Sequence, residues 1–170
     1  GKSVFFDIIN ALLGSHNLLS FSLQSLTNES GYSRVKFANM LANYTSELSK
    51  KMDSAIFKQL ISGEPVEARS PYGQPFMIND YAKLVFNVNE LPKDLEHNNA
   101  FFRRLLIIPF NVTIPKAEQD KEFAKKVIAS ELSGVFNWVI KGLMRLLEQK
   151  EFSVCKASED EIDTYKKHSN

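Results

Sequence analysis

Cysteine and long apolar runs are scarce in this sequence, and each absence excludes a class of protein. Cys155 is the single cysteine among 170 residues, so the chain cannot form an internal disulfide and has no cysteine cluster for zinc. His16, His97 and His168 lie far apart in the sequence and form no metal-ligand pattern. No apolar run approaches the ~20 residues that a membrane span requires, and no segment resembles a signal peptide. We therefore expect a protein of the reducing cytoplasm without a membrane partner.

An excess of charge is absent as well. The chain has 21 Lys and Arg against 20 Asp and Glu, for a net charge of +1. A protein that coats duplex DNA nonspecifically is usually far more basic. Any contact with nucleic acid must therefore be local, or concentrated by assembling several copies of the chain around one strand.

Helical and extended patterns alternate over the first 110 residues. Apolar residues recur at helical spacing in residues 3–14 and again after Asp53, which is a predicted N-cap, as far as the predicted stop at Gly63. Alternating or continuous apolar runs predict strands at residues 19–23, 39–45, 81–88 and 105–108.

A hairpin is predicted between the first helices and the last strands. Residues 65–69 and 74–78 are short strand-like pieces that flank Ser70-Pro71-Tyr72-Gly73, whose residue types match a type I turn. Arg69 and Tyr72 would then lie at or beside the tip. A cation and an aromatic ring on a projecting loop suit a single nucleic-acid strand, through phosphate attraction and base stacking. A surface hairpin without such a role is the alternative.

The character of the sequence becomes helical beyond Pro115. Two amphipathic helices are predicted from apolar spacing, and Trp138 lies on the apolar face of the second, where we expect it in the core. Ser158-x-x-Glu161 is a capping box that predicts a helix at the tail. This order of elements predicts an α/β sheet domain followed by a C-terminal helical attachment.

The chain begins with Gly1-Lys2-Ser3, directly before the first predicted helix. The P-loop motif ends in the same three residue types, and in a P-loop the loop amides and a helix N-terminus hold phosphates, Lys neutralises the β/γ oxygens and Ser binds Mg²⁺. A cloning scar or a chance match is the alternative, since the first glycine of the motif and the four residues after it are missing.

Two polar residues follow predicted strands. Glu47 could polarise a water molecule for attack on a γ-phosphate, and Asn89 could orient that water without adding charge. The alternatives are a surface glutamate and an asparagine that makes a local turn.

Arg103 and Arg104 directly precede the apolar run at residues 105–108. Adjacent residues of an extended chain point to different sides, so one arginine could reach a neighbouring subunit. An arginine supplied in trans stabilises transition-state charge and contributes roughly 10³–10⁵ in rate. An ordinary pair of cations at a strand edge is the alternative.

Taken in order, these segments resemble the superfamily 3 helicase domain of phage, plasmid and poxvirus-type primase–helicases. Gly1-Lys2-Ser3 matches the end of the Walker A motif, and FSLQSL followed by ANYTSELS is similar to the Walker B segment, with Glu47 as its glutamate. KLVFNVNELP resembles the sensor strand and identifies Asn89 as the sensor asparagine. FKQLISGEPVEARSPYGQPF resembles the DNA-contacting hairpin, AFFRRLLIIPF the arginine-finger segment, and ELSGVFNWVIKGLMRL the C-terminal helical region.

The resemblance implies an α/β fold of the P-loop NTPase type, AAA+-like, with a mainly parallel sheet flanked by helices and a C-terminal helical subdomain. It implies an ATPase core at residues 1–112, with the N-terminal strand and most of the P-loop absent, and a helical subdomain at residues 113–170. It further implies an ATP-hydrolysing DNA helicase that acts in replication of a mobile element, as a homo-hexameric ring around single-stranded DNA and with a primase domain upstream.

The cofactors implied are ATP and Mg²⁺, with Gly1, Lys2 and Ser3 as the nucleotide-binding residues. Ser3 and Glu47 are the implied metal ligands. Many P-loop ATPases have Asp-Glu at Walker B, whereas this chain has Ser46 before Glu47. Metal coordination by this strand therefore stays open, and Ser3 becomes the main protein ligand.

Two other functions stay open on the sequence. In the first, the chain is an origin-binding or assembly module that does not turn over ATP. The Ser46 substitution favours this function. The second is a different P-loop enzyme, such as a small-molecule kinase that acts as a monomer.

Overall fold

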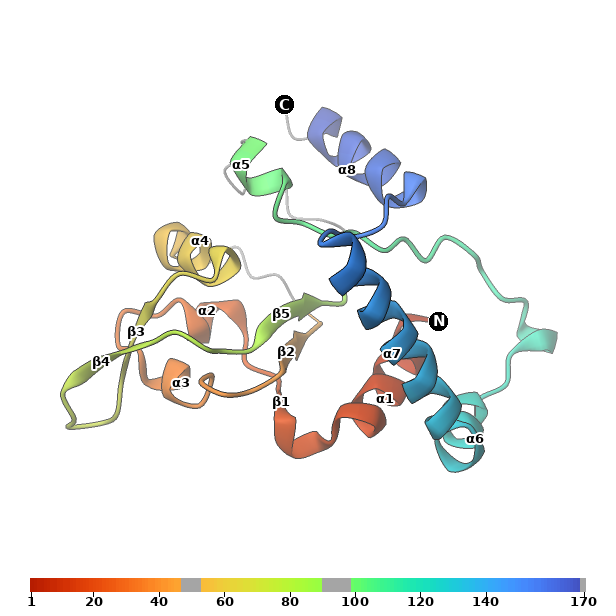
Figure 1. Ribbon diagram of the computed structural model, residues 1–170, viewed down its shortest axis with the longest axis horizontal. Coiled ribbons are helices and arrows are strands. Elements are labelled where there is room, and N and C mark those ends of the chain that lie inside the picture. The colour runs from red at the N-terminus through yellow and green to blue at the C-terminus, as the bar shows by residue number, and fades with distance from the viewer. Residues whose placement is uncertain (47–52, 90–98, 169–170) are drawn as a thin grey trace. The chain divides into compact units, whose positions relative to one another are not determined.

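A computed structural model describes residues 1–46, 53–89 and 99–168 of the chain (Figure 1). The chain divides into two compact units. The sheet unit comprises Ser15–Leu106 and Ile162–Asn170, and the helical unit comprises Gly1–Gly14 and Ile107–Glu161. The predicted division at residue 112 stays a prediction, because compactness alone does not show where a domain folds independently.

The sheet unit contains a parallel sheet of three strands in the order β1-β2-β5. These strands are β1 (Leu18–Leu19), β2 (Ala42–Thr45) and β5 (Lys83–Phe86). β2 and β5 pair along their whole length, from Ala42 opposite Lys83 to Thr45 opposite Phe86. The prediction of a mixed α/β fold is thereby confirmed, whereas the finer assignment to the P-loop NTPases stays a prediction.

A buried asparagine extends the contact between the first two strands. Asn43, in β2, has no exposed side-chain surface. Its Oδ1 accepts a hydrogen bond from the backbone N of Phe21 at 2.8 Å, and its Nδ2 donates to the backbone O of Phe21 at 2.9 Å. The amide therefore satisfies both backbone groups of Phe21 as a neighbouring strand would.

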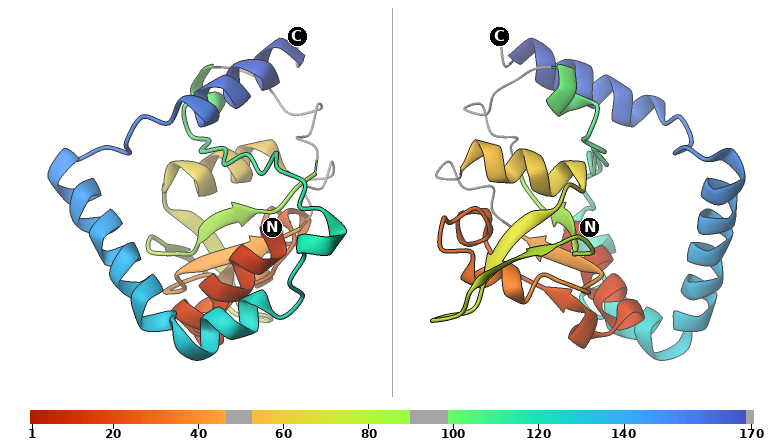
Figure 2. Two further views of the ribbon diagram at one scale, coloured as in Figure 1. Left: turned by 90° about the vertical axis from the view of Figure 1, so that its right-hand side faces the viewer. Right: turned by 60° about the vertical axis from the view of Figure 1, so that its left-hand side comes forward.

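The connection from β2 to β5 contains helix α4 (Ser54–Ser62) and an antiparallel hairpin of β3 (Val66–Arg69) and β4 (Pro75–Ile78). The hairpin projects from the sheet unit in Figure 1 and in the right-hand view of Figure 2. Its base packs against α2 (Leu23–Leu26) and α3 (Tyr32–Val35) around one hydrophobic core. The core residues are Leu26, Phe37, Leu60, Val66, Ala68, Ile78, Tyr81 and Ala82.

Both predicted ends of α4 are confirmed. The Asp53 side chain accepts hydrogen bonds from the backbone N of Ala55 at 2.8 Å and of Ile56 at 3.0 Å, which satisfies two of the free amides of the first turn. Gly63 ends the helix with φ of 72°, a left-handed conformation that costs glycine little.

Two predicted strands differ from the structure. Residues 19–23 form a strand only at their start, because the Ser22 hydroxyl accepts a hydrogen bond from the backbone N of Ser25 and begins helix α2. The run at residues 105–108 forms no strand, and Leu106 and Ile108 are 57% and 63% exposed. It pairs with no strand among the described residues, so its apolar pattern alone does not produce a ladder.

The helical unit contains α1 (Lys2–Leu13), η2 (Lys116–Glu118), α6 (Phe123–Ser130), α7 (Leu132–Gln149) and the start of α8 (Lys156–His168). Helix α1 contacts both α6 and α7, and the ring of Phe5 lies 6.2 Å from that of Phe110. In the described part of the chain no helix is long and apolar enough to cross a membrane.

Two predictions for the C-terminal helices are wrong. Trp138 is 70% exposed, because the apolar stripe of α7 is wider than the part that α1 and α6 contact. Ser158 is not an N-cap: α8 already begins at Lys156, and the backbone N of Ser158 donates to the carbonyl of Cys155 at 3.0 Å.

Two glycines with opposite backbone requirements offer a test of this fold. Gly63→Ala should lower the free energy of unfolding by about 1 kcal/mol, because a Cβ has open space there but disfavours φ of 72°. Gly142→Ala should raise it by about 0.5–1 kcal/mol, because Gly142 lies inside α7 and its Cβ would also meet nothing within 4 Å. Urea denaturation followed by circular dichroism measures both free energies of unfolding. A change of the same sign in the two variants would contradict these backbone conformations.

Candidate functional site

The first candidate region is the N-terminus of α1. Gly1 is the N-cap residue, Lys2 and Ser3 lie in the first turn, and no side chain caps the helix. Amides of the first turn and the positive end of the helix dipole therefore stand where phosphate oxygens bind in many proteins. This is the local geometry that the predicted P-loop residues require, and it belongs to the helical unit.

The carboxyl ends of β2 and β5 are a second candidate region, and they belong to the sheet unit. β2 ends at Thr45 and is followed by exposed Ser46. Beyond β5 the backbone N of Asn87 donates to the carbonyl of Thr45 at 2.9 Å, so the pairing continues past the last strand residue. Exposed Asn89 comes two residues later. Glu47, the predicted water-positioning and metal-binding residue, lies outside the described residues.

A polar contact that sequence reasoning missed holds these two strand ends together. The Nδ2 atom of Asn87 donates to the hydroxyl of Tyr44 at 2.9 Å. The asparagine lies directly after a hydrophobic strand, which is the only signal in the sequence that could have identified it. Asn87 and Tyr44 thus fix the edge from which Asn89 and the Ser46 segment leave the sheet.

The hairpin tip places the predicted DNA-contacting residues together. The backbone N of Gly73 donates to the carbonyl of Ser70 at 2.9 Å, which closes the turn, and Arg69 Nε donates to the carbonyl of Gly73 at 2.9 Å. Tyr72 is fully exposed. A guanidinium and an aromatic ring therefore share the tip.

The turn type differs from the prediction. Tyr72 has φ of 60°, which belongs to a type II turn and not to the type I turn predicted from residue preferences. A type II turn favours glycine at this position, so an aromatic residue there strains the backbone by roughly 1 kcal/mol or more. Tyr72 is therefore held by the closed turn in a conformation that it would not adopt alone.

A buried arginine that the sequence did not reveal anchors the base of the hairpin. Arg34 is 2% exposed and donates from its guanidinium to the carbonyls of Leu26 at 2.8 Å, of Asn28 at 2.7 Å, and of Glu67 in β3. Burial lowers the pKa of Arg34, and the nearby carboxylates of Glu67 and Asp53 oppose that shift. The side chain stays charged, as guanidinium groups do in proteins, and ties β3 to the α2–α3 segment.

The two candidate arginines follow α5 (Asn99–Phe102) in the sheet unit. The backbone N of Arg104 donates to the carbonyl of Phe101 at 3.0 Å, and that of Leu105 donates to the carbonyl of Phe102 at 3.1 Å. Arg103 and Arg104 are exposed, whereas Phe101 and Phe102 are buried. The structure therefore presents both arginines at the surface on a hydrogen-bonded turn.

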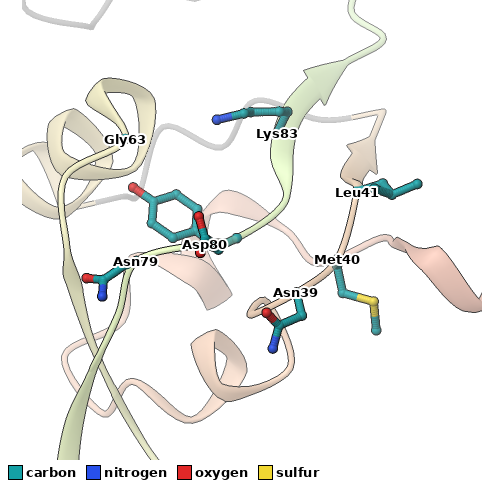
Figure 3. Close-up of a pocket in the computed structure, with 8 residues that line it drawn as sticks. Asn39, Met40, Leu41, Gly63, Asn79, Asp80 and Lys83 are labelled. Atoms are coloured by element: carbon teal, nitrogen blue, oxygen red, sulfur yellow. The ribbon is translucent and has the colours of Figure 1, made fainter.

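A pocket of about 540 Å³ lies at the opposite edge of the parallel sheet (Figure 3). Its lining comes from the segments before β2 and β5 and from the end of α4, and comprises Asn39, Met40, Leu41, Gly63, Asn79, Asp80, Tyr81 and Lys83. Ligands of open parallel sheets bind outside the carboxyl ends of the strands. We therefore assign the candidate site to the carboxyl edge and not to this pocket.

Metal-binding clusters of three or more His, Cys, Asp or Glu do not occur among the described residues. Gly1, Lys2 and Ser3 belong to the helical unit, whereas Asn89, Arg69, Tyr72, Arg103 and Arg104 belong to the sheet unit. Within the sheet unit the structure brings Arg69 together with Tyr72, and sets Arg103 beside Arg104.

Removing Arg34 offers a test of the hairpin anchor. Arg34→Met should lower the free energy of unfolding by roughly 3 kcal/mol or more, because the carbonyls of Leu26, Asn28 and Glu67 lose a charged donor in a buried place. The matched change Arg145→Met, at an exposed position of α7, should alter it by less than about 0.5 kcal/mol. Equal stability of the two variants in denaturant titrations would refute the anchor.

Comparison with protein families finds a match over the first part of the chain. The family model described as a family of unknown function (DUF5906) matches residues 1–104, which is more than half of the sequence and includes every candidate site residue. The comparison with curated proteins finds no match.

Proposed function

This chain belongs to the DUF5906 family, and we propose that it is the ATP-driven motor domain of a DNA helicase that acts in replication of a mobile element. In this proposal Lys2 neutralises the phosphates, and Ser3 is the main Mg²⁺ ligand. Glu47 positions the attacking water and Asn89 contacts the γ-phosphate. Arg103 or Arg104 acts on the nucleotide of the neighbouring subunit in a hexameric ring.

The observation that carries the proposal is the parallel pairing of β2 with β5. Because the strands are parallel and in register, Ser46, which precedes Glu47 in the sequence, and Asn87–Asn89 leave the sheet at the same edge. That edge is the usual place for a ligand in an open α/β sheet. A carboxylate can orient a water molecule for attack on a phosphate, and a neutral amide can contact the γ-phosphate without adding charge, which are the roles proposed for Glu47 and Asn89.

The start of α1 supports the phosphate-binding half of the proposal. A helix of 12 residues supplies a full macrodipole, and its first turn carries Lys2 and Ser3. Lys supplies a point charge for phosphate oxygens, and a serine hydroxyl at this position is a Mg²⁺ ligand in P-loop proteins.

The hairpin supports a single nucleic-acid strand as the second partner. Stacking on an aromatic ring does not depend on base identity, and a neighbouring cation attracts the phosphate backbone. Tyr72 and Arg69 meet these requirements on a turn closed by two hydrogen bonds. In a ring, several such hairpins would concentrate positive charge that the near-neutral single chain lacks.

A second candidate is an origin-binding or assembly module of the same kind of protein without turnover. The observation that favours it is Ser46, which stands where many P-loop ATPases have the aspartate that helps to hold Mg²⁺. The two functions differ in whether ATP hydrolysis depends on Glu47.

ATP hydrolysis by the full-length protein separates the two. Lys2→Ala and Glu47→Gln should each lower kcat by roughly 10²-fold or more, because each removes a group that acts on the transition state. Lys36→Ala, which removes an exposed cation outside the proposed site, should leave kcat unchanged. Equal ATPase rates in all four proteins would eliminate the motor function, and ATP binding without hydrolysis in the unmodified protein would establish the module instead.

Single-stranded DNA binding at several salt concentrations tests the hairpin. Tyr72→Asn should weaken binding by about 1–3 kcal/mol without changing the salt dependence, because asparagine tolerates the left-handed turn but cannot stack as a ring does. Arg69→Ala should reduce the salt slope by about 0.7, as expected for one lost phosphate contact. Tyr72→Phe should bind as the unmodified protein does, and unchanged affinity in both loss variants would remove the hairpin from the DNA site.

A further inference from the structure

The sheet unit contains a second aromatic cluster apart from its main hydrophobic core. Phe57 of α4, Phe101 and Phe102 of α5, and Tyr165 of α8 are between 4% and 6% exposed. Ring centroids are 6.2 Å apart for Phe57 and Phe101, 5.6 Å for Phe101 and Phe102, and 5.5 Å for Phe102 and Tyr165. The four rings therefore form a continuous row from α4 to the C-terminal helix.

The last contact of this row has a defined geometry. The rings of Phe102 and Tyr165 meet edge to face at an interplanar angle of 86°, and Lys166 Nζ lies 5.6 Å from the centroid of the Phe102 ring. Edge-to-face pairs stabilise a contact beyond the area that the two rings bury. Helices α5 and α8 also lie side by side in Figures 1 and 2.

Helix α5 depends on these contacts for its position. It has four residues, Asn99–Phe102, and a single helical turn is not stable by itself in water. Phe102 directly precedes Arg103, and the amides of Arg104 and Leu105 donate to carbonyls of the two phenylalanines. The backbone that carries the arginines is therefore fixed where Phe101 and Phe102 are fixed.

We propose that Tyr165 is a positioning residue for the arginine segment, holding Phe102 and thereby the direction in which Arg103 and Arg104 leave the surface. The proposal rests on the proposed function, in which one of these arginines acts on a neighbouring subunit. Tyr165 lies beyond residues 1–104, so the family match does not include it. The C-terminal helix then contributes to hydrolysis by the neighbouring subunit's site without touching nucleotide itself.

Hydrogen exchange tests the positioning without any need for ATPase activity. In Tyr165→Ala the exchange protection of the Arg104 and Leu105 amides should fall by about tenfold to a hundredfold, as loss of a buried aromatic contact implies. The amide of Asn87, which extends the β2–β5 ladder, should keep its protection. Tyr165→Phe should behave as the unmodified protein, and Tyr165→Leu should be intermediate.

Unchanged protection of Arg104 and Leu105 in Tyr165→Ala would overturn the positioning role. An equal loss at Asn87 would overturn it too, since Tyr165 would then merely stabilise the whole unit. If the alanine variant does not fold, the same comparison of the Arg104, Leu105 and Asn87 amides is made in Tyr165→Leu. Tyr32→Ala, at a partly exposed tyrosine of α3, should change none of the three amides.

Mixing of variant subunits tests whether Tyr165 affects ATP hydrolysis by the neighbouring subunit. Tyr165→Ala should lower kcat for ATP by about tenfold or more and leave KM within about twofold, less than the roughly 10³-fold loss of a complete arginine finger. A mixture of Tyr165→Ala and Lys2→Ala subunits should hydrolyse ATP faster than the sum of the rates of the two variants measured separately. In mixed rings the Tyr165→Ala subunit still has an intact nucleotide site. A neighbouring Lys2→Ala subunit can supply it with an arginine that an intact Tyr165 positions.

A mixture of Lys2→Ala with the Arg103→Ala, Arg104→Ala double variant serves as the reference for restoration in trans. If that reference restores activity and the Tyr165→Ala mixture does not, the positioning role is wrong. If the unmodified protein hydrolyses no ATP, the proposed motor function fails, and hydrogen exchange alone decides whether Tyr165 positions the arginine segment.

Discussion

Four residue pairs hold β2 against β5 in parallel, and this ladder fixes the rest of the sheet unit. Two parallel neighbours cannot be joined by a tight turn, so the chain must cross over between them. The crossover here carries both α4 and the β3–β4 hairpin. The hairpin proposed to contact DNA therefore lies on the connection that leaves the carboxyl end of β2 and returns to the start of β5, and the parallel pairing requires that connection to exist.

Buried polar side chains keep this connection in place. The side-chain amide of Asn43 makes the two hydrogen bonds to the Phe21 backbone that a neighbouring strand would otherwise make. The Arg34 guanidinium joins β3 to the α2–α3 segment through hydrogen bonds to backbone carbonyls. The backbone N of Asp53 also donates to the Thr27 hydroxyl at 3.1 Å, which links the start of α4 to the end of α2. Buried groups of this kind are costly to leave unpaired, so they define one arrangement of α2, α4 and the hairpin.

Local signals in the sequence predicted the presence of helices and turns better than their details, since the turn at Pro71 is of another type and Ser158 is not a cap. Asp53, Gly63 and the residues around Pro71 act within a few positions of themselves, and the structure has the helix and hairpin that they predict. Features that depend on distant partners were not predictable in this way. The run at residues 105–108 has the composition of a strand but pairs with no neighbour in the described part of the chain, and the role of Arg34 depends on carbonyls up to 33 positions away. The same holds for the candidate site. Its residue types can be read from the sequence, but the contact between Tyr44 and Asn87, which are distant in the sequence, cannot.

We propose that Lys2, at the start of the first helix, and Asn89, beyond β5, act on one triphosphate. A crystal structure of the full-length protein with a non-hydrolysable ATP analogue and Mg²⁺ tests it most directly. We predict Lys2 Nζ and Asn89 Nδ2 within about 3.2 Å of phosphate oxygens of the same nucleotide, the range of a hydrogen bond. A nucleotide bound away from the carboxyl edge of β2 and β5, or Lys2 and Asn89 on opposite sides of it with only one in contact, would contradict the account.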